Sequence, residues 1–479
     1  MHNLRLLLAL SFLIVFSGCV ENEIERYDVL ISVEPHGSAS ISPEVYGPLF
    51  PGDSLSITIT PADGFSFDQW SGTINSVEET ITIFGTQDHQ LNATLSDVSH
   101  LPEEVEVYKK SQFDPHPIFA VHLGANTSVV INKDGEIIQE YNFENRLGND
   151  IERLPNGEFL GIFKPMTKTH ISFGGSGGVL RRINADQQTL WQYVISSETE
   201  LAHHDLERLP NGNVMTIVWE KITTEQAKAL GAQTEGPIYL EKLVEIDPNT
   251  DEIVWQWRSA DHLIQDVDDS ASTYGNIRQY PRKIDINYNS HIEDGDWMHA
   301  NGIVYDHTRD LVFMTVNFYD EVWVIDHSTT TAQASTASGG NYGVGGDLVY
   351  RFGNPAAYGS AQPPIFDHVH HPNFSNDNNT QMLFFSNGET AERSIVFELQ
   401  LPAQLSLDPN IENPPEIVWQ FSHPEMYYRI VSGAVKLPNG NVLICEGDFG
   451  FWEINPSGDV VWKMKGYQSG FWRAYPVLD

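Results

Sequence analysis

Leu-Pro-Asn-Gly occurs three times in this chain, at residues 154–157, 209–212 and 437–440. Pro-Asn-Gly is a typical turn sequence, because proline presets the backbone angle that opens a turn and Asn and Gly tolerate the left-handed conformation. A turn that recurs in one chain indicates a repeat architecture, in which equivalent positions of successive repeats come together in space. The three copies therefore predict a repeat fold and point to the residues that hold the same place in each copy.

Histidines hold one such place. Five residues before the three copies lie Asn149, His204 and Ser432. Two degenerate copies extend the set, since His299 lies five residues before one of them and His370 five residues before the other. A histidine beside an aspartate before a turn can simply end a strand, but three histidines in one register favour a shared site. The sequence therefore predicts that His204, His299 and His370 converge.

A second half-repeat alternates with the first and consists of an apolar strand, a turn and another apolar strand. Its six copies are residues 129–141, 179–193, 243–257, 322–352, 395–421 and 451–464. This spacing predicts an all-β fold, a six-bladed β-propeller of four-stranded blades, over residues 105–479. One inner pair is missing, and residues 471–476 are expected to supply an inner strand there and close the ring. Residues 223–230 are the one stretch with a convincing helical pattern.

The residues before the propeller predict an exported protein with a small additional domain. Residues 1–19 resemble a bacterial lipoprotein signal, with an apolar run and small residues directly before Cys19. We expect a lipid on Cys19 that alone holds the protein to the membrane, on the periplasmic or outer face of the cell envelope. After a tether at 20–26, residues 27–97 predict a small β domain. The segment around Trp70 resembles a module common in bacterial surface proteins, which implies a spacer or adhesion role.

Composition excludes one class of partner. The net charge is −38, from 65 acidic and 27 basic residues, and such a surface repels phosphate backbones, so we expect no nucleic-acid binding. Besides Cys19 the only cysteine is Cys445, in an apolar stretch that predicts a buried thiol without a disulfide. Two Gly/Ser-rich segments, residues 173–178 and 338–346, lack the strand and helix that flank a phosphate-binding loop, and are expected to be insertions at blade edges.

The three histidines allow several kinds of chemistry. Neutral imidazole can be a nucleophile, a base or a metal ligand, and imidazolium can be an acid or bind an anion. On a strand, His368 would share the face of His370, while His371 would point away. Three imidazoles could also hold zinc, but these come from separate blades without the short spacing of a typical zinc site. We therefore expect no metal and no other cofactor.

Several separated motifs resemble the bacterial arylsulfate sulfotransferases over residues 105–479. They are His-His-Asp before Leu-Pro-Asn-Gly-Asn, Asp-Trp-Met-His-Ala-Asn-Gly, Trp-Glu-Lys before the helical stretch, and Val-Ile-Asp-His-Ser-Thr-Thr-Thr, in the family's order. The resemblance implies an exported six-bladed propeller that moves a sulfuryl group from an aryl sulfate to a phenol, without a nucleotide sulfate donor. Small aryl sulfates and phenols would be its partners.

The resemblance also implies roles for individual residues. In the family, a channel histidine attacks sulfur and forms a sulfohistidine, supported by two further histidines and an arginine. Matched by motif, the nucleophile is His370, with His368 as the fallback, and the supporting histidines are His204 and His299. Asn317 takes the place of the arginine at the substrate. Its amide donates hydrogen bonds but carries no charge and lacks the bidentate fork of a guanidinium.

Two functions remain open from the sequence. One is the sulfotransferase, which three histidines at the family's positions favour. The other is a non-catalytic propeller that binds a glycan or an aromatic ligand at the cell surface, which the missing arginine favours. Arg351, Arg429 and Arg473 lie near other strand ends, where one of them could compensate for the loss.

Overall fold

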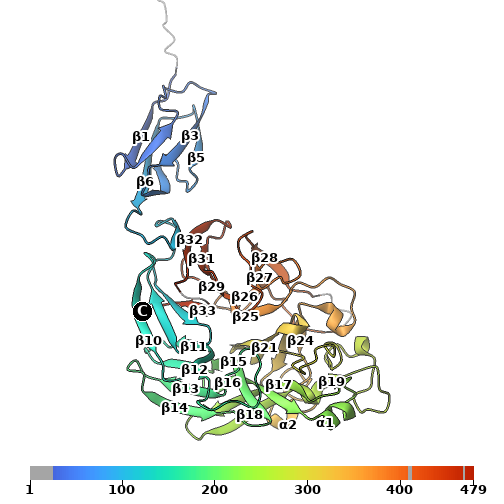
Figure 1. The fold of residues 1–479 in the computed structure, drawn as a ribbon. Helices are drawn as coiled ribbons and strands as arrows, with labels where there is room; N and C mark the ends of the chain where they lie inside the picture. Colours follow the sequence, from blue (N-terminus) through green and yellow to red (C-terminus); the bar gives the residue numbers. More distant parts are fainter. Residues whose placement is uncertain (1–24, 408–412, 468–469, 479) are drawn as a thin grey trace, which may run out of the picture. The chain divides into compact units, whose positions relative to one another are not determined.

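The computed structural model describes residues 25–407, 413–467 and 470–478. The chain divides into two compact units, Met1–Ser99 and His100–Asp479 (Figure 1). Cys19 and the expected signal sequence lie outside the described residues. In the part of the chain that is described, no helix combines the length and the apolar character that a membrane crossing requires.

The first unit contains two three-stranded sheets around one apolar core. The sheets are β1 (Val29–Glu34), β6 (His89–Asp97) and β4 (Phe65–Gly72), and β2 (Ala39–Ser42), β3 (Ser54–Pro61) and β5 (Thr80–Phe84). Apolar side chains alternate along β3, where Ile57 and Ile59 are buried. Trp70 is fully buried in the same core. Each sheet thus buries one apolar face against the other, which is how two small sheets become stable.

The second unit is a six-bladed β-propeller, as the repeat predicts. Each blade is a four-stranded antiparallel sheet, from inner to outer strand: β33 (Phe471–Pro476), β8 (Ile118–His122), β9 (Thr127–Ile131), β10 (Ile137–Asn142); β11 (Leu147–Arg153), β12 (Phe159–Phe163), β13 (Val179–Ile183), β14 (Thr189–Val194); β15 (Glu200–Arg208), β16 (Val214–Ile222), β17 (Ile238–Asp247), β18 (Glu252–Arg258); β21 (Ala300–Asp306), β22 (Leu311–Val316), β23 (Glu321–Asp326), β24 (Tyr350–Phe352); β25 (Val369–Phe374), β26 (Gln381–Ser386), β27 (Ile395–Gln400), β28 (Glu416–Phe421); and β29 (Gly433–Lys436), β30 (Val442–Glu446), β31 (Gly450–Ile454), β32 (Val460–Lys465). Cys445 is buried in β30, as expected.

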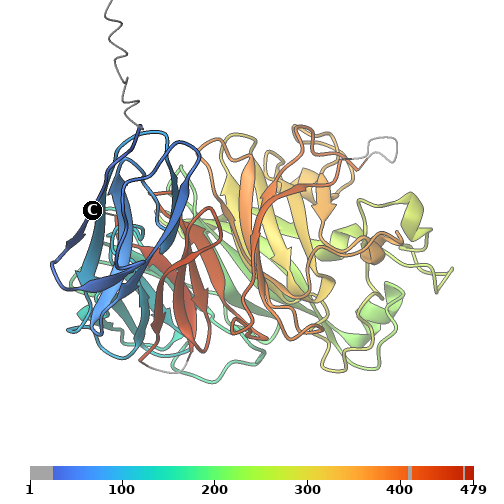
Figure 2. The same ribbon diagram turned by 90° about the horizontal axis from the view of Figure 1, so that it is seen from above.

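The inner strands close into a ring. They lie beside one another in the order β33, β11, β15, β21, β25 and β29, and β29 again lies beside β33. In Figure 1 the colours run from cyan at β11 through green, yellow and orange to red at β29, and β33, also red, completes the ring; Figure 2 shows the same sheets from above. The inner ends of six blades therefore meet around one axis, where side chains of distant sequence can come together.

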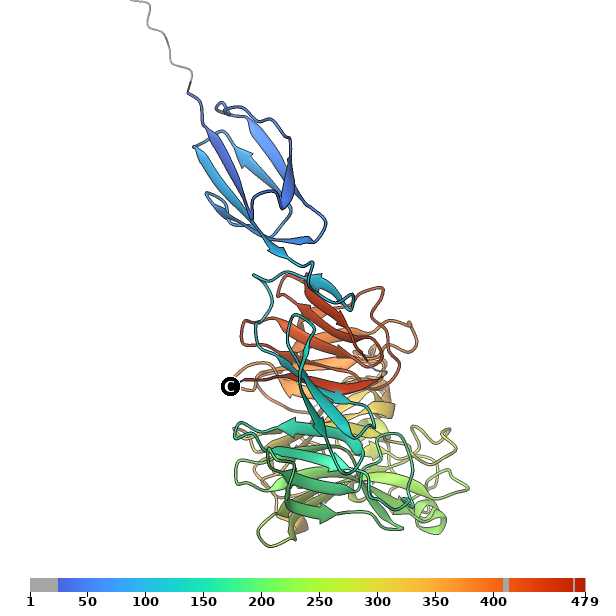
Figure 3. The ribbon, with the colours of Figure 1, turned by 60° about the vertical axis from the view of Figure 1, so that its left-hand side comes forward.

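Two strands join the first and last blades. β33 pairs with β8, which confirms the prediction that residues 471–476 supply the missing inner strand. β7 (Val105–Tyr108) pairs with β32 at the outer edge of the last blade, which the sequence did not predict. In Figure 3 the red strands of the last blade and the cyan strands of the first lie side by side. The propeller is thus closed once at its inner and once at its outer edge.

Helices occupy only the connections between strands. α1 (Thr224–Ala229) begins after Thr223, which forms a capping box with Gln226, and confirms the helix expected there. α2 (Thr331–Ala334) begins with the same box at Thr330 and was not predicted. The remaining short elements are η1 (Ser259–His262), β19 (Leu263–Ile264), η2 (Ile277–Gln279), β20 (Ile284–Asp285), η3 (Asn317–Tyr319) and η4 (Pro355–Tyr358). The Gly-rich segment 338–346 lies in the outer connection between β23 and β24, as expected for an insertion.

Candidate active site

The inner strands bring the three histidines of the repeat together. His204 lies in β15, His299 directly before β21, and His370 in β25. The ring centroids of His204 and His299 are 4.7 Å apart. Trp472 of β33 lies beside them, with its ring 5.9 Å from that of His204 and 6.4 Å from that of His370. Three blades thus contribute to one group, which we call the histidine cluster (His204, His299 and His370), and the first blade places Trp472 beside it.

Irregular backbone at the inner strands aims these side chains. The pairing of β15 with β16 shifts register around His204, which takes a left-handed φ of 57°. His299 has a φ of 53° directly before its strand. In the fifth blade the left-handed residue is His371, with a φ of 54°, one position after His370. A bulge re-aims the side chains beside it. In this blade the left-handed residue therefore follows the cluster histidine by one position, whereas in the third and fourth blades the two are the same residue.

His370 has a defined free nitrogen. The side-chain NH2 of Asn387 donates to the carbonyls of Tyr428 and Val431, at 2.7 and 3.0 Å. The amide oxygen of Asn387 therefore faces His370 and must accept, so the Nδ1–H of His370 donates to it at 2.6 Å. This leaves the Nε2 lone pair free. Burial lowers the pKa of His370 to about 3, so the ring is neutral and able to act as a nucleophile.

His299 is the member of the cluster whose pKa is raised. Its Nδ1 lies 2.5 Å from a carboxylate oxygen of Asp296, and its ring stacks on Phe318 at 4.7 Å between centroids. Burial alone would lower the pKa of His299, but the Asp296 carboxylate outweighs burial and raises it above its ordinary value. When the ring is protonated, its second nitrogen is a donor for negative oxygen atoms.

His204 is neutral by contrast. Its Nδ1 lies 2.8 Å from the Nδ1 of the adjacent His203, and both side chains are buried. Burial, followed by the charge on His299, places the pKa of His204 well below its ordinary value. The cluster therefore combines a neutral nucleophile, a cation and a neutral ring that can exchange a proton.

Asn317 lies between two members of the cluster. It begins η3 and its backbone N–H donates to the carbonyl of His299 at 3.2 Å. Its side-chain NH2 lies 3.4 Å from both the carbonyl of Val369 and the Nδ1 of His370. Asn317 is therefore buried at the cluster, beside the His299 ring whose pKa is raised.

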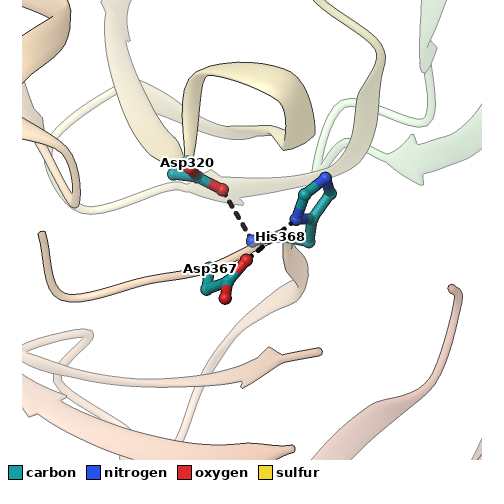
Figure 4. A group of neighbouring side chains, drawn as sticks. All are labelled: Asp320, Asp367 and His368. Atoms are coloured by element: carbon teal, nitrogen blue, oxygen red, sulfur yellow. Dashed lines mark hydrogen bonds and ion pairs between the residues drawn. The ribbon is translucent and has the colours of Figure 1, made fainter. Parts of the chain in front are cut away.

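His368 does not share a strand face with His370, as the sequence suggested. It precedes β25 and has a left-handed φ of 59°, so the strand alternation does not reach it. Its Nδ1 turns to Asp367 at 3.0 Å, and its backbone N–H donates to Asp320 at 2.6 Å (Figure 4). The His368 side chain is 31% exposed and lies at the solvent side of the cluster, with its ring 6.3 Å from that of Phe318.

Side chains with the spacing of metal ligands lie around His368 and not in the histidine cluster. Among the described residues, the one group of His, Cys, Asp or Glu with ligand atoms close enough for an ion is Asp320, Asp367 and His368, within 4.8 Å of one another. Hydrogen bonds within the group already explain this closeness. The three-histidine zinc site considered from the sequence is therefore not supported by the geometry.

The Gly/Ser-rich segment 173–178 lies on the histidine cluster, not at a blade edge as expected. It belongs to the connection between β12 and β13, and the carbonyl of Gly175 accepts from the backbone N–H of His204 at 3.0 Å. Ser176 forms a β-bridge with His203. A Cβ on Gly175 would lie 2.1 Å from the Nε2 of His204. Small residues are needed here because the loop backbone covers an imidazole.

Substitution Gly175→Ala is expected to lower turnover about 100-fold, because the new methyl group must displace His204 or the loop. Gly212→Ala is the matched control, since Gly212 also has a positive φ, 90°, but has nothing within 4 Å of its Cβ position. The control should lose about 1–2 kcal/mol of stability from its left-handed backbone and keep its turnover. Steady-state kinetics and urea unfolding separate the two effects. Wild-type turnover in Gly175→Ala would contradict the packing assigned to this loop.

Arg473 lies beneath the cluster and holds three blades together. Both of its terminal nitrogens donate to one carboxylate oxygen of Asp205 at 3.1 Å, and Asp150 lies 3.7 Å away. Asp205 also accepts from the backbone N–H of Ile303 at 2.9 Å. Of the arginines considered as replacements for the family residue, only this one lies in the channel, because Arg351 pairs with Glu321 and Arg429 is exposed beside Glu389. Two carboxylates already neutralise Arg473.

The channel holds more acid than Arg473 can neutralise. Burial, opposed by Arg473 and helped by the neighbouring carboxylates, raises the pKa of Asp150 to about 7. Burial and the charge of Asp150 raise the pKa of Glu152 to about 8. Burial likewise places the pKa of Glu207 well above its ordinary value. These carboxyl groups are therefore more readily protonated in the folded than in the unfolded protein.

The free energy of unfolding is expected to fall as the pH rises from 6 to 8. A carboxyl with a raised folded pKa contributes its full stability below its unfolded pKa and loses it as the pH passes its folded pKa, here about 7 for Asp150 and about 8 for Glu152. Each group contributes at most about 1.4 kcal/mol per pH unit. Urea unfolding at several pH values should show a shallower decline in Glu152→Gln than in the exposed control Glu198→Gln. Equal declines in both variants would contradict the assignment.

A separate cavity of about 670 Å³ lies between the outer strand of the fourth blade and the connections at residues 278–281, 406–407 and 413–415. Its lining includes Tyr350 and Phe352 of β24, together with Tyr358 of η4. None of the histidines of the cluster lines it. This cavity lacks the nucleophile, the cation and the proton-exchanging ring. The histidine cluster therefore remains the candidate active site.

Comparison with known proteins adds a family. A family model described as Arylsulfotransferase (ASST) matches residues 104–467. No curated protein matches this chain. Similar solved structures include a candidate 6-phosphogluconolactonase from Bacteroides fragilis, with a TM-score of 0.40 and 9% identity over 76% of this chain and 98% of that chain. Hydrazine synthase from Kuenenia stuttgartiensis has a TM-score of 0.33 and 11% identity over 81% of this chain and 99% of that chain.

Proposed function

This chain belongs to the arylsulfotransferase family, and we propose that it transfers a sulfuryl group from an aryl sulfate to a phenol through a sulfohistidine on His370, without a nucleotide sulfate donor. The observation that carries the proposal is the Asn387 contact, which leaves the Nε2 of a neutral His370 as the free nucleophile. A nitrogen nucleophile that is also a good leaving group suits a transfer in two displacements.

In the first displacement, the Nε2 lone pair of His370 attacks sulfur. The N–S bond forms while the bond from sulfur to the aryl oxygen breaks, and the departing phenolate takes a proton. In the second displacement, an acceptor phenol loses its proton and its oxygen takes sulfur from nitrogen. The Nδ1–H of His370 stays hydrogen-bonded to the Oδ1 of Asn387 throughout. The imidazolium of His299 stabilises charge on the sulfuryl oxygens, where the family's arginine is absent.

A coupled assay tests the proposal. The protein from residue 20 onward is incubated with 4-nitrophenyl sulfate, with and without phenol. We expect nitrophenolate release that depends on phenol, and a sulfated peptide containing His370 by mass spectrometry after quenching. Absence of turnover over several donors, in protein shown to be folded by circular dichroism, would favour the non-catalytic propeller. Calorimetric binding of phenyl sulfate or of glycans would then test that second function, which the missing charge at Asn317 favours.

Attachment to the cell envelope belongs to the same proposal. The run of small residues before Cys19 supports a lipid on its sulfur and a location on the periplasmic or outer face. Metabolic labelling with a fatty acid should mark the wild-type protein and not Cys19→Ser. Equal labelling of both proteins would exclude Cys19 as the acylated residue.

A further inference from the structure

We propose that Glu241 and His203 form a proton relay with His204, which makes His204 the acid of the first displacement and the base of the second. The relay rests on the proposed function for its role in turnover, but its proton positions are a property of the resting protein. Glu241 and His203 act through His204 and are therefore positioning residues.

The relay is a continuous chain of three buried groups. The Nε2 of His203 lies 3.0 Å from one carboxyl oxygen of Glu241, and its Nδ1 lies 2.8 Å from the Nδ1 of His204. The other oxygen of Glu241 accepts from the backbone N–H of Ala300 at 2.8 Å. Glu241 and His203 are 0% exposed. Each group in the chain thus has one partner on either side, and the free end is the Nε2 of His204.

The rings are held too tightly to exchange protons by turning over. His203 stacks on Trp219, with centroids 3.7 Å apart and planes inclined by 5°. The loop at Gly175 packs against the His204 ring, because a Cβ on Gly175 would lie 2.1 Å from the Nε2 of His204. Protons must therefore move along the chain while the rings stay fixed.

The contacts allow two proton arrangements. In the first, Glu241 is protonated and donates to the Nε2 of His203, whose Nδ1–H donates to the Nδ1 of His204, and His204 carries Nε2–H. In the second, Glu241 is a carboxylate that accepts from the Nε2–H of His203, whose Nδ1 accepts from the Nδ1–H of His204. The Nε2 of His204 then has a lone pair. The two arrangements differ by one proton, and no imidazolium appears in either.

The two arrangements match the two displacements. In the first displacement, the Nε2–H of His204 goes to the departing phenolate, the Nδ1–H of His203 moves to His204, and the Glu241 proton moves to His203. The phenol leaves neutral and Glu241 becomes the carboxylate. In the second displacement the acceptor phenol gives its proton to the Nε2 of His204 and the chain runs back. One proton leaves and one enters, so the cycle balances.

Burial favours the neutral arrangement at rest. Desolvation, with the nearby Asp296, holds the pKa of Glu241 well above its ordinary value. Desolvation also holds the pKa of His203 and His204 well below theirs. The charges that face the relay are Asp296 and His299. Further along the channel, His370 and Arg473 face His204. A buried carboxyl between neutral imidazoles is thus ready to hold the proton.

Glu241→Gln breaks the relay with little change of shape. The amide oxygen must accept from Ala300, so its NH2 faces His203 and the His204 Nε2–H arrangement becomes permanent. Glu245→Gln is the matched control, because Glu245 lies on the same strand and pairs with His327 at 2.9 Å, outside the cluster. Both variants keep a hydrogen-bonding side chain of the same length.

The first measurement is independent of activity. Nitrogen-15 spectra of histidine-labelled protein, assigned with His204→Gln, report which nitrogen of His204 carries the proton. In the wild type and in Glu245→Gln, the proton is expected to move from Nε2 to Nδ1 as the pH rises. In Glu241→Gln it should stay on Nε2. The same pH response in all three proteins would overturn the relay, whether or not the protein transfers sulfuryl groups.

The second measurement uses turnover. The turnover of Glu241→Gln with phenyl sulfate should fall about 100-fold, because its phenolate needs a proton to leave. The turnover with 4-nitrophenyl sulfate should fall much less. Glu245→Gln should show the wild-type ratio of the two donors. If Glu241→Gln does not fold, the wild-type rate with phenyl sulfate in mixtures of H2O and D2O replaces it. A curved dependence supports several protons moving together, and a straight one overturns the relay.

Discussion

Substitution His370→Ala is expected to lower aryl sulfate turnover by at least about four orders of magnitude, because it removes the imidazole nitrogen that we propose as the nucleophile. The stability of the protein should change little by comparison, although the Oδ1 of Asn387 loses its donor. Added imidazole should restore part of the rate with 4-nitrophenyl sulfate, since the alanine leaves space where the ring was. Initial rates with and without imidazole measure both effects.

The matched control is His307→Ala, at an exposed turn position between β21 and β22. It removes an imidazole without touching the histidine cluster and should keep the wild-type rate. If the His370→Ala protein still formed a sulfated peptide, the nucleophile would be another residue. His204→Ala and His299→Ala, measured the same way, would then identify it.

Substitution Arg473→Met is expected to destabilise the propeller by about 3–5 kcal/mol, because it leaves the buried carboxylates Asp205 and Asp150 without their cation. Urea unfolding measures the loss. Adding Asp205→Asn to Arg473→Met should recover part of it, since one of the unpaired charges then disappears. The loss should be largest at high pH, where the channel carboxyls are ionised.

Arg429→Met is the control for a surface ion pair. Arg429 is exposed and lies 3.1 Å from Glu389, so its removal should cost less than about 1 kcal/mol. Equal losses in the two variants would mean that the channel pair contributes no more than a surface pair. The structure predicts a clear difference, because the Arg473 side chain is only 4% exposed.

The repeat predicted the blades because each outer hairpin carries its own turn and its own pair of apolar strands. It also predicted the inner strand at residues 471–476, since an odd hairpin remained unpaired. It did not predict β7 at the outer edge of the last blade, because four residues without a turn carry too little pattern. The repeat also did not predict that the left-handed residue of the fifth blade is His371, one position after His370. A bulge leaves no sign in the spacing of hydrophobic residues.

The members of the histidine cluster could be named from their register, but their partners could not. Asn387 directly follows the second strand of its blade, and Glu241 lies on the third strand of its blade. No sequence repeat relates either residue to a histidine. Their role depends on side-chain hydrogen bonds to a histidine on another strand of the same blade, which spacing in the sequence does not encode. His203 left one signal, since it stands beside His204 in His-His-Asp. The Gly/Ser-rich loop left another, because consecutive small residues allow backbone to approach a ring.

β33 has a consequence for the synthesis of the protein. A nascent chain can form the second to fifth blades early, and with them every member of the histidine cluster. Trp472 and Arg473 arrive with the last described strand, so the channel has neither its aromatic wall nor its cation until then. A ribosome that stops before residue 471, or a protease that removes β33, would leave all three histidines in an open ring. The channel around the histidine cluster is therefore incomplete until translation has passed β33.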